Sequence, residues 1–353
     1  MNNDISDYFG IIIDTSYFVE QCYKFNSPTL TLLYDLKKRF NIQLFLPDVV
    51  DFEIKKHIKQ DCNELYDKIS KYHFIDISKD FGDRLILHLN KKYKKFNENL
   101  STIILQSSSI DVSDVLKNYF EQTPPFSAKK KEEFPDAIAL YEIKNLIQKI
   151  GKKVIVISKD SDWETFLKDN KNVLFLNNIP SVYTYFKISK EFDAKTIMPI
   201  ISSYKFKEIL ESKFNQSTPN IDFLEPYGSL YITPEFEGYS VEDYELTRDD
   251  IETLEKNENL YTIKINISST LYCYCTFSSE IYDSIDKDFT PYNDVSKKIK
   301  IYFQTDIILS LEDKSNTLIL KDIELIDVPK FLNFGEIDPV SDDFYENIEE
   351  NSI

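Results

Sequence analysis

Up to about residue 215, short runs of Ile, Val, Leu and Phe alternate with longer amphipathic segments. Short apolar runs are typical of buried strands, and apolar residues at helical spacing are typical of helices packed on a sheet. Strands that take turns with helices fold into a parallel sheet. We therefore expect an N-terminal α/β domain with a central parallel sheet. Its strands are expected at 11–13, 43–46, 153–157 and 173–176, and its helices at 28–40, from Asp48 onward and at 137–150, with Gly151 ending the last.

The pattern changes after residue 217, where long segments alternate apolar and polar residues. Such alternation is typical of antiparallel strands with one buried face. The segments at 261–278, 297–313 and 317–328 therefore indicate an antiparallel meander. We expect the chain to divide into an α/β domain at 1–190 with a helical insertion at about 83–121, a connecting helix or linker at 191–217, a β-rich domain of the α+β class at 218–333, and an acidic, disordered tail at 334–353.

The charge of the chain divides at the same place. The net charge of −18 for the whole chain argues against a nucleic-acid partner, because binding of phosphates depends mostly on Lys and Arg. Residues 1–217, however, contain 32 Lys and Arg against 30 Asp and Glu, whereas residues 218–353 contain 10 against 30. The N-terminal part can therefore bind an anion, and the C-terminal part would repel one.

Several classes of protein do not fit this composition. No apolar stretch approaches the roughly 20 residues that a membrane-spanning helix needs, and the first residues lack the basic and apolar regions of a secretion signal. Four cysteines, mostly far apart, do not suit a disulfide framework, so we expect a cytoplasmic protein. Six glycines without a G-x-G-x-x-G pattern exclude a dinucleotide loop, and Ser16 stands where a haloacid dehalogenase-type phosphatase has its second Asp.

The histidines and cysteines do not suggest a zinc site. The three histidines are scattered along the sequence, which leaves too few nearby ligands. Cys273 and Cys275 stand on one face of an expected strand, where packing in a half-buried sheet explains them better than metal binding.

Five acidic residues are expected at one edge of the parallel sheet. Ligands of such sheets bind outside the carboxyl ends of the strands. One acid follows the first strand, two follow the strand at 153–157, and two stand near the starts of helices: Asp14, Asp160, Asp162, Glu53 and Asp136. Each alone has an ordinary explanation as a helix cap, turn residue or solvated side chain. Their common position favours one functional cluster.

Crowded carboxylates repel one another unless a cation holds them together. Mg²⁺ and Mn²⁺ prefer oxygen ligands, keep several waters and bind substrate phosphates. Such a site activates a water and stabilises the leaving oxygen of a phosphodiester. The cluster therefore predicts hydrolysis of phosphodiester bonds assisted by one or two Mg²⁺ or Mn²⁺ ions.

Four short motifs occur in this region: D-T-S at 14–16, P-x-x-V-x-x-E at 47–53, D-A-x-A at 136–139 and S-K-D-S-D-W at 158–163. In this order and spacing they resemble the motifs of the PIN-domain nuclease superfamily. The segment K-K-x-E-F-P-D-A before the third acid is similar to that of one branch of the superfamily. The resemblance covers a little over half of the chain and implies a Rossmann-like fold. Trp163 and Ser158 depart from the usual Phe and Thr, and the insertion between the second and third acids is long.

The resemblance also implies roles for individual residues. Asp14, Glu53, Asp136 and Asp160 would form the metal-binding quartet, with Asp162 as a fifth, supporting acid. Thr15, Ser16 and Ser158 would hydrogen bond within the site. Apart from the resemblance, His57 is a candidate for a supporting contact because it stands one turn after Glu53.

Lysine runs are candidates for phosphate contacts. One run stands just before the third acid and the other in the insertion: Lys129, Lys130 and Lys131, and Lys91, Lys92, Lys94 and Lys95. Tyr93 and Phe96 lie within the second run, where they would suit stacking on unpaired bases, although helical core packing explains Phe96 equally well.

We therefore expect a metal-dependent nuclease whose substrate is RNA, with single-stranded DNA as the alternative. The resemblance implies a role as a toxin, in phage defence or in RNA turnover. The acidic C-terminal domain is expected to dock a protein partner, to form a homo-oligomer or to shield the basic rim of the site; no membrane partner is expected. The competing hypothesis is a non-catalytic interaction or regulatory protein on the same scaffold, which five converging carboxylates argue against.

Overall fold

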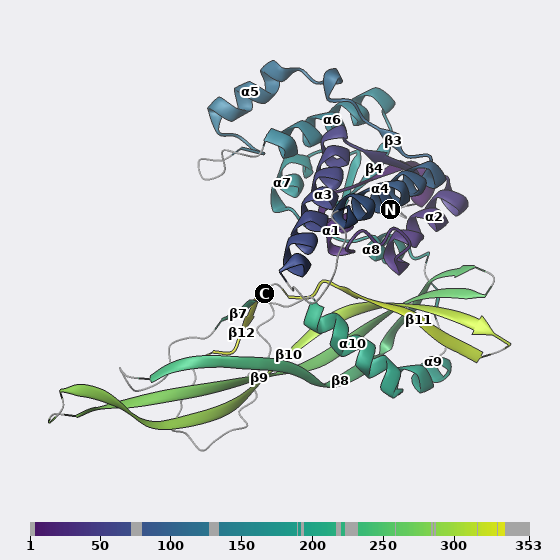
Figure 1. Ribbon diagram of the computed structural model, residues 1–353. Helices are drawn as coiled ribbons and strands as arrows, with labels where there is room; N and C mark the ends of the chain where they lie inside the picture. The colour runs from purple at the N-terminus through teal and green to yellow at the C-terminus, as the bar shows by residue number, and fades with distance from the viewer. Residues whose placement is uncertain are drawn as a thin grey trace. The chain divides into compact units, whose positions relative to one another are not determined.

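The computed structural model describes residues 4–71, 80–126, 134–188, 190–191, 194–216, 220–222, 232–257, 259–283, 285, 287–315, 317–329 and 331–335. The chain forms two compact units, residues 1–189 and 190–353, and each is described by itself. Figure 1 labels their helices and strands. No helix in the described part of the chain is long and apolar enough to cross a membrane.

Unit 1 is built on a five-stranded sheet in the order β3-β2-β1-β4-β5, and every pair of neighbouring strands is parallel. The strands are β1 (Tyr8–Ile13), β2 (Gln43–Leu46), β3 (Ile103–Ile104), β4 (Lys153–Ile157) and β5 (Val173–Leu176). The expected α/β domain with a parallel sheet is thus confirmed. Strand β3 was not among the expected strands: this two-residue edge strand lies inside the segment that was expected to be a helical insertion.

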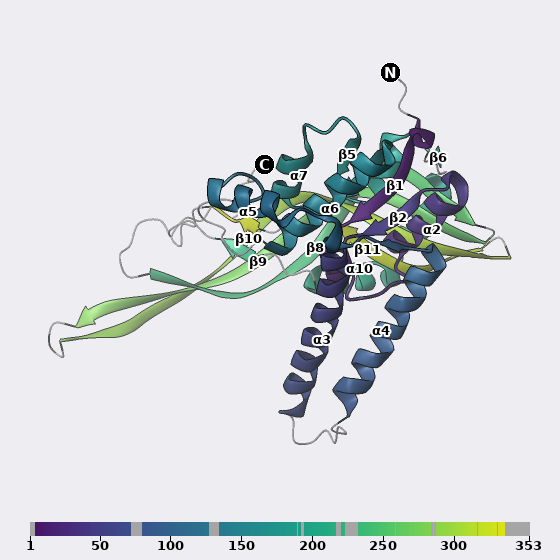
Figure 2. The same cartoon turned by 90° about the horizontal axis from the view of Figure 1, so that it is seen from above.

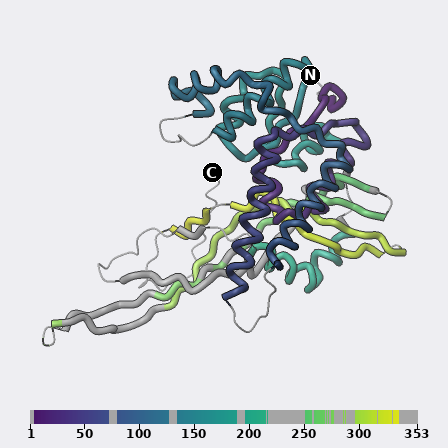
Figure 3. Tube along the Cα trace, turned by 45° about the horizontal axis from the view of Figure 1, so that its top comes forward, coloured from purple at the N-terminus to yellow at the C-terminus, as the bar shows by residue number. Residues whose placement is uncertain are grey.

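Eight α-helices of the described residues connect and cover these strands. They are α1 (Ser16–Glu20), α2 (Pro28–Phe40), α3 (Asp48–Ser70), α4 (Phe81–Leu100), α5 (Val112–Glu121), α6 (Phe134–Ile150), α7 (Ser161–Leu167) and α8 (Pro180–Tyr185), with short 3₁₀ helices at Ile5–Asp7 (η1) and Ser107–Ser109 (η2). Helices α3 and α4 run side by side in opposite directions (Figures 2 and 3). Gly151 has a left-handed φ of +59° directly after α6, as expected for a residue that ends a helix.

The core of unit 1 is formed by the central strands and the helix faces packed on them. Ile11, Ile12 and Ile13 of β1 are almost fully buried, as are Val154 to Ile157 of β4. Gly10 belongs to the same packing, because a Cβ there would lie 2.4 Å from the ring of Phe45. These buried runs fix the two central strands, whose carboxyl ends carry Asp14 and Asp160.

Unit 2 is built on an antiparallel sheet in the order β11-β10-β9-β8-β6, so the expected antiparallel β-rich region is confirmed. Its strands are β6 (Lys190–Glu191), β8 (Ile232–Asn257), β9 (Leu260–Asp283), β10 (Asp288–Lys314) and β11 (Thr317–Ile326); β7 (Asn220–Asp222) and β12 (Phe331–Asn333) pair in parallel. Cys275 of β9 is buried in the core of this unit.

Residues 191–217 contain α9 (Ala194–Ile201) and α10 (Tyr204–Gln216). Their apolar residues, including Ile197, Phe206 and Phe214, pack in one cluster with the strands of unit 2. This segment, expected to connect two domains, therefore contributes to the core of the second unit. Phe334 is buried in the same cluster, and residues 336–353 of the expected tail lie outside the described residues.

Candidate functional site

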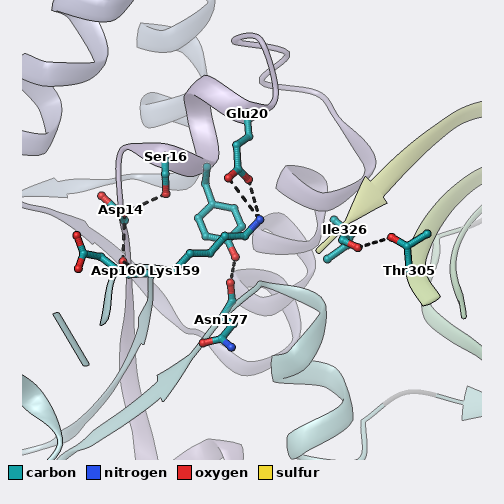
Figure 4. Close-up of polar contacts among 10 residues, drawn as sticks. Asp14, Ser16, Glu20, Lys159, Asp160, Asn177, Thr305 and Ile326 are labelled. Atoms are coloured by element: carbon teal, nitrogen blue, oxygen red, sulfur yellow. Dashed lines mark hydrogen bonds and ion pairs between the residues drawn. The ribbon is translucent and has the colours of Figure 1, made fainter. Parts of the chain in front are cut away.

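Asp14 is held at the carboxyl ends of β1 and β4. Its backbone N–H donates to the carbonyl of Ile157 at 3.1 Å, which continues the pairing of the two strands by one residue. Its Oδ2 accepts a hydrogen bond from Ser16 Oγ at 2.9 Å (Figure 4). The same oxygen accepts a second hydrogen bond from Ser158 Oγ at 3.1 Å. The carboxylate is therefore fixed from both strand ends.

Asp160 is the N-cap residue of α7 and lies three residues after the end of β4. Its Oδ1 accepts a 2.7 Å hydrogen bond from the N–H of Asp162, in the way of a helix N-cap, and its own N–H donates to Ser158 Oγ at 3.0 Å. Ser158 thus links Asp14 to Asp160. Burial raises the pKa of Asp14, the charge of Asp160 raises it further, and the two serine hydroxyls only partly offset this.

Glu53 lies on α3 and is held by Thr15. The hydroxyl of Thr15 donates to Glu53 Oε2 at 2.8 Å, and Thr15 itself is buried. Burial is the main cause that raises the pKa of Glu53, and the charge of Asp136 also raises it; the Thr15 hydrogen bond, His57 and Lys56 act in the opposite direction. Glu53 and Asp136 are therefore close enough for their charges to interact.

Asp136 lies in the first turn of α6 and accepts a hydrogen bond from Trp163. The indole Nε1–H donates to Asp136 Oδ1 at 3.1 Å, and the Trp163 side chain is 1% exposed. A Phe at this position could not donate this bond. Trp163 departs from the Phe that is usual in the similar motif, and a buried tryptophan usually finds a partner for its N–H, which is the signal that could have revealed the contact.

The structure therefore arranges the predicted acids in two interacting pairs. Asp14 and Asp160 are linked through Ser158, and Glu53 and Asp136 interact electrostatically, while Thr15 connects the end of β1 to Glu53. Asp162 lies beside Asp160 in the first turn of α7. The three hydroxyl residues expected to support the site all hydrogen bond within it.

The ligand types of this cluster suit a hard divalent cation. Carboxylate oxygens are what Mg²⁺ and Mn²⁺ prefer, and carboxyl groups with pKa values raised by burial and by one another gain most from a cation between them. In the arrangement shown, no three Asp, Glu, His or Cys side chains of the described residues lie close enough to hold one ion in common.

An ion pair beside the site was not anticipated from the sequence. Lys159 Nζ lies 3.1 Å from Glu20 Oε2 and 3.3 Å from Oε1, which ties the loop before Asp160 to the end of α1 (Figure 4). Tyr17 of α1 donates a hydrogen bond to the carbonyl of Asn177, after β5. Helix α1 is thereby fastened to the same edge of the sheet. No short motif predicts these contacts, because the residues are far apart in the sequence.

The predicted substrate contacts are only partly placed. Lys91 and Lys92 are exposed on α4, whereas Lys129, Lys130 and Lys131 lie outside the described residues. The suggestion that Tyr93 and Phe96 stack on bases is wrong, because each is 2% exposed. Their rings pack with Phe18 and Phe25, and Tyr93 Oη donates to Asp51 Oδ1 at 2.9 Å.

Comparison with known proteins identifies the family of this region. Residues 11–163 match the family model described as PIN domain. The match spans the sequence from β1 to Trp163, and all five acids lie inside it. No curated protein and no solved structure matches the chain.

Proposed function

The chain contains a PIN domain at residues 11–163, the domain of a family of typically metal-dependent nucleases, and we propose that it hydrolyses phosphodiester bonds with the help of Mg²⁺ or Mn²⁺. RNA is the proposed substrate, with endonucleolytic cleavage, and single-stranded DNA is the alternative. The observation that supports this most is the convergence of carboxylates from four elements on one edge of the parallel sheet, each held by a donor of the protein itself.

The proposed metal ligands are Asp14, Glu53, Asp136 and Asp160, for one or two ions. A bound divalent ion supplies an activated water and stabilises the charge of the leaving oxygen. Ser16 and Ser158 orient Asp14, Thr15 orients Glu53, and Trp163 orients Asp136. These donors also reduce the rearrangement that the carboxylates need before they can hold an ion, because each already has one oxygen in place.

Lysines would position the nucleic-acid backbone. Residues 1–217 have a formal balance of 32 positive against 30 negative side chains, and the five clustered acids account for part of the negative charge. With those five acids set aside, the remaining balance is 32 against 25, which favours an anionic substrate. Lys129, Lys130 and Lys131, close to Asp136 in the sequence, are the first candidates, and Lys91 and Lys92 are the second.

The biological role is proposed from the family alone: a toxin, a phage-defence nuclease or an enzyme of RNA turnover, acting in the cytoplasm. For unit 2 we propose a regulatory part, either a docking surface for a protein partner or a second copy, or an acidic shield for the lysines. Its balance of 10 positive against 30 negative side chains after residue 217 supports a role other than binding nucleic acid.

Metal binding tests the proposal against a non-catalytic PIN scaffold. Calorimetric titration with Mn²⁺ should show binding to the wild type and none to the Asp14→Asn/Asp136→Asn double variant. Binding of equal strength to both proteins would show that these two acids do not bind the metal.

A further inference from the structure

A second pair of acids lies inside unit 1, away from the candidate site. Asp48 is the first residue of α3 and Glu142 stands in the middle of α6. Asp48 is 8% exposed and Glu142 is 2% exposed. Buried acids are costly unless they are paired or neutralised, so this pair requires an explanation.

Hydrogen bonds satisfy one oxygen of each acid. The N–H of Asp48 donates to Glu142 Oε2 at 3.1 Å. Asp48 Oδ2 accepts from both the N–H and the hydroxyl of Ser107, each at 2.8 Å. Asp48 Oδ1 and Glu142 Oε1 are the remaining oxygens, and both are buried without a hydrogen-bond partner when the two groups are treated as carboxylates.

One proton would satisfy both remaining oxygens, since a protonated carboxyl group donates a hydrogen bond and a carboxylate accepts it. The two side chains are close enough to interact as a hydrogen-bonded pair. We propose that Asp48 and Glu142 share a single proton, carried by Glu142, and that this carboxyl–carboxylate bond fastens the start of α3 to α6.

The surroundings explain which acid keeps its charge. Asp48 stands at the N-terminus of α3, where the unpaired backbone N–H groups favour a negative charge. Burial alone would raise the pKa of Asp48, but the hydrogen bonds from Ser107 and Glu142 outweigh it and leave that pKa below its usual range. Asp48 is therefore the carboxylate of the pair.

Glu142 has the opposite environment. Burial, and then the hydrogen bond and charge of Asp48, raise the pKa of Glu142 to about 8. The neighbouring residues do not offset this rise in the pKa of Glu142. From η2, Ser107 is neutral and hydrogen bonds to Asp48. Lys149 of α6 lines the same cavity of about 830 Å³ as Glu142 but does not lower its pKa.

The pair is placed to position the candidate site. Glu53 follows Asp48 by five residues on α3, and Glu142 follows Asp136 by six residues on α6. A bond between Asp48 and Glu142 therefore holds together the two helices that carry Glu53 and Asp136. Asp48 and Glu142 are positioning residues in this account. The inference goes beyond the proposed function, because the shared proton joins these helices whatever reaction the site performs.

Urea unfolding at a series of pH values tests the shared proton. Trp163 is the single tryptophan of the chain and lies in unit 1, so its fluorescence follows that unit. Glu142→Gln mimics the protonated acid, since its amide donates to Asp48 and its carbonyl accepts from the Asp48 N–H. Glu142→Ala does neither. Glu64→Gln, on the exposed side of α3, removes the same charge elsewhere and serves as the control.

Because the pKa of Glu142 is raised to about 8, the folded state still holds a proton on Glu142 between about pH 5 and 8, whereas the unfolded state has already released it. The wild-type unfolding constant should therefore rise with pH more steeply than that of Glu142→Gln, by up to about tenfold per pH unit. Glu142→Gln should match the wild type near pH 5 and be more stable above pH 8. Glu64→Gln should keep the wild-type steepness, and Glu142→Ala should be destabilised already at pH 5.

Carbon NMR of the wild-type chain labelled at the glutamate carboxyl carbons gives a measurement that needs no stable variant. One signal should titrate near pH 8, and it should be missing in Glu142→Gln. The inference is overturned if that signal titrates below pH 6, if Glu142→Gln keeps the wild-type pH dependence, or if it is as unstable as Glu142→Ala at pH 5. None of these readouts depends on cleavage or metal.

Discussion

The hydroxyl of Thr15 donates a 2.8 Å hydrogen bond to Glu53 Oε2 and so connects the residue that follows Asp14 to the helix that carries the second acid. The two residues stand 38 positions apart, yet this bond joins the end of β1 to α3 at the edge where the acids converge. It also opposes the rise in the pKa of Glu53 that burial causes. A carboxylate held in this way is oriented before any cation binds.

Replacing Thr15 with Val keeps the side-chain volume but removes the donor. We expect the affinity for Mn²⁺ to fall by about 10- to 100-fold, the usual loss when a group that orients a metal ligand is removed. Thr15→Ser keeps the hydroxyl and should bind Mn²⁺ nearly as well as the wild type. Calorimetric titration of the three proteins measures the difference; equal affinity for Thr15→Val and wild type would show that the bond does not orient Glu53.

The Trp163 indole should matter through its N–H rather than its size. Trp163→Phe keeps a buried aromatic ring but leaves Asp136 without this donor. We expect metal-dependent cleavage to fall by about 10- to 100-fold. Circular dichroism should show an intact fold. If Trp163→Phe cleaves as fast as the wild type, the indole N–H does not contribute to cleavage and Trp163 acts through packing alone.

The raised pKa of Asp14 predicts how stability depends on pH in the absence of metal. A folded-state pKa above the unfolded value means that the neutral acid is favoured by folding, so its contribution is complete below about pH 4 and is lost as the pH rises through the folded value. In EDTA, Asp14→Asn should therefore melt at a higher temperature than the wild type at pH 7 and at the same temperature at pH 4.

Metal should reverse that order at pH 7. Mn²⁺ at 100 times its dissociation constant should stabilise the wild type by about 2.7 kcal/mol and leave Asp14→Asn unchanged. Thermal melts with and without EDTA measure both effects. Asp169→Asn changes an exposed acid after α7 and should behave as the wild type throughout. A metal-induced rise in the melting temperature of Asp14→Asn would contradict the assignment.

The first lysine run should account for more of the nucleic-acid affinity than the second. Replacing Lys129, Lys130 and Lys131 with Gln should weaken binding of single-stranded RNA and reduce the slope of log K against log salt by about 2, since each phosphate contact contributes about 0.7. Lys91→Gln/Lys92→Gln should change the slope less. Fluorescence anisotropy with a labelled oligonucleotide in EDTA separates binding from cleavage. An unchanged slope in the triple variant would exclude these phosphate contacts.

The elements that were predictable from the sequence are those whose pattern is local. The strands at 43–46, 153–157 and 173–176 match their expected bounds because each is a buried apolar run between polar residues. Strand β3 was not predictable, since two residues form no pattern and only pairing with β2 defines them. Strand β8 is acidic along much of its length, which hides the alternation that revealed β9 and β10.

The site shows the same limit. The positions of the acids follow from strand ends and helix starts, so they could be nominated from the sequence. The bonds that hold them could be only partly anticipated, because Thr15 and Glu53, or Trp163 and Asp136, meet through tertiary packing. Asp48 and Glu142 stand 94 positions apart, and neither stood out alone. Tyr93 illustrates the opposite error: its lysine neighbours suggested a surface role, but helical periodicity placed it in the core.

The most direct test of the account is a cleavage assay supplemented with Mn²⁺ on tRNA, mRNA-like RNA, single-stranded DNA and double-stranded DNA. It compares the wild type with Asp136→Ala and with Asp169→Ala as the matched control. We expect the wild type and Asp169→Ala to cleave RNA, EDTA to stop both, and Asp136→Ala to remain at background. Equal cleavage by wild type and Asp136→Ala, or no cleavage of any substrate by the wild type, would contradict the proposed nuclease.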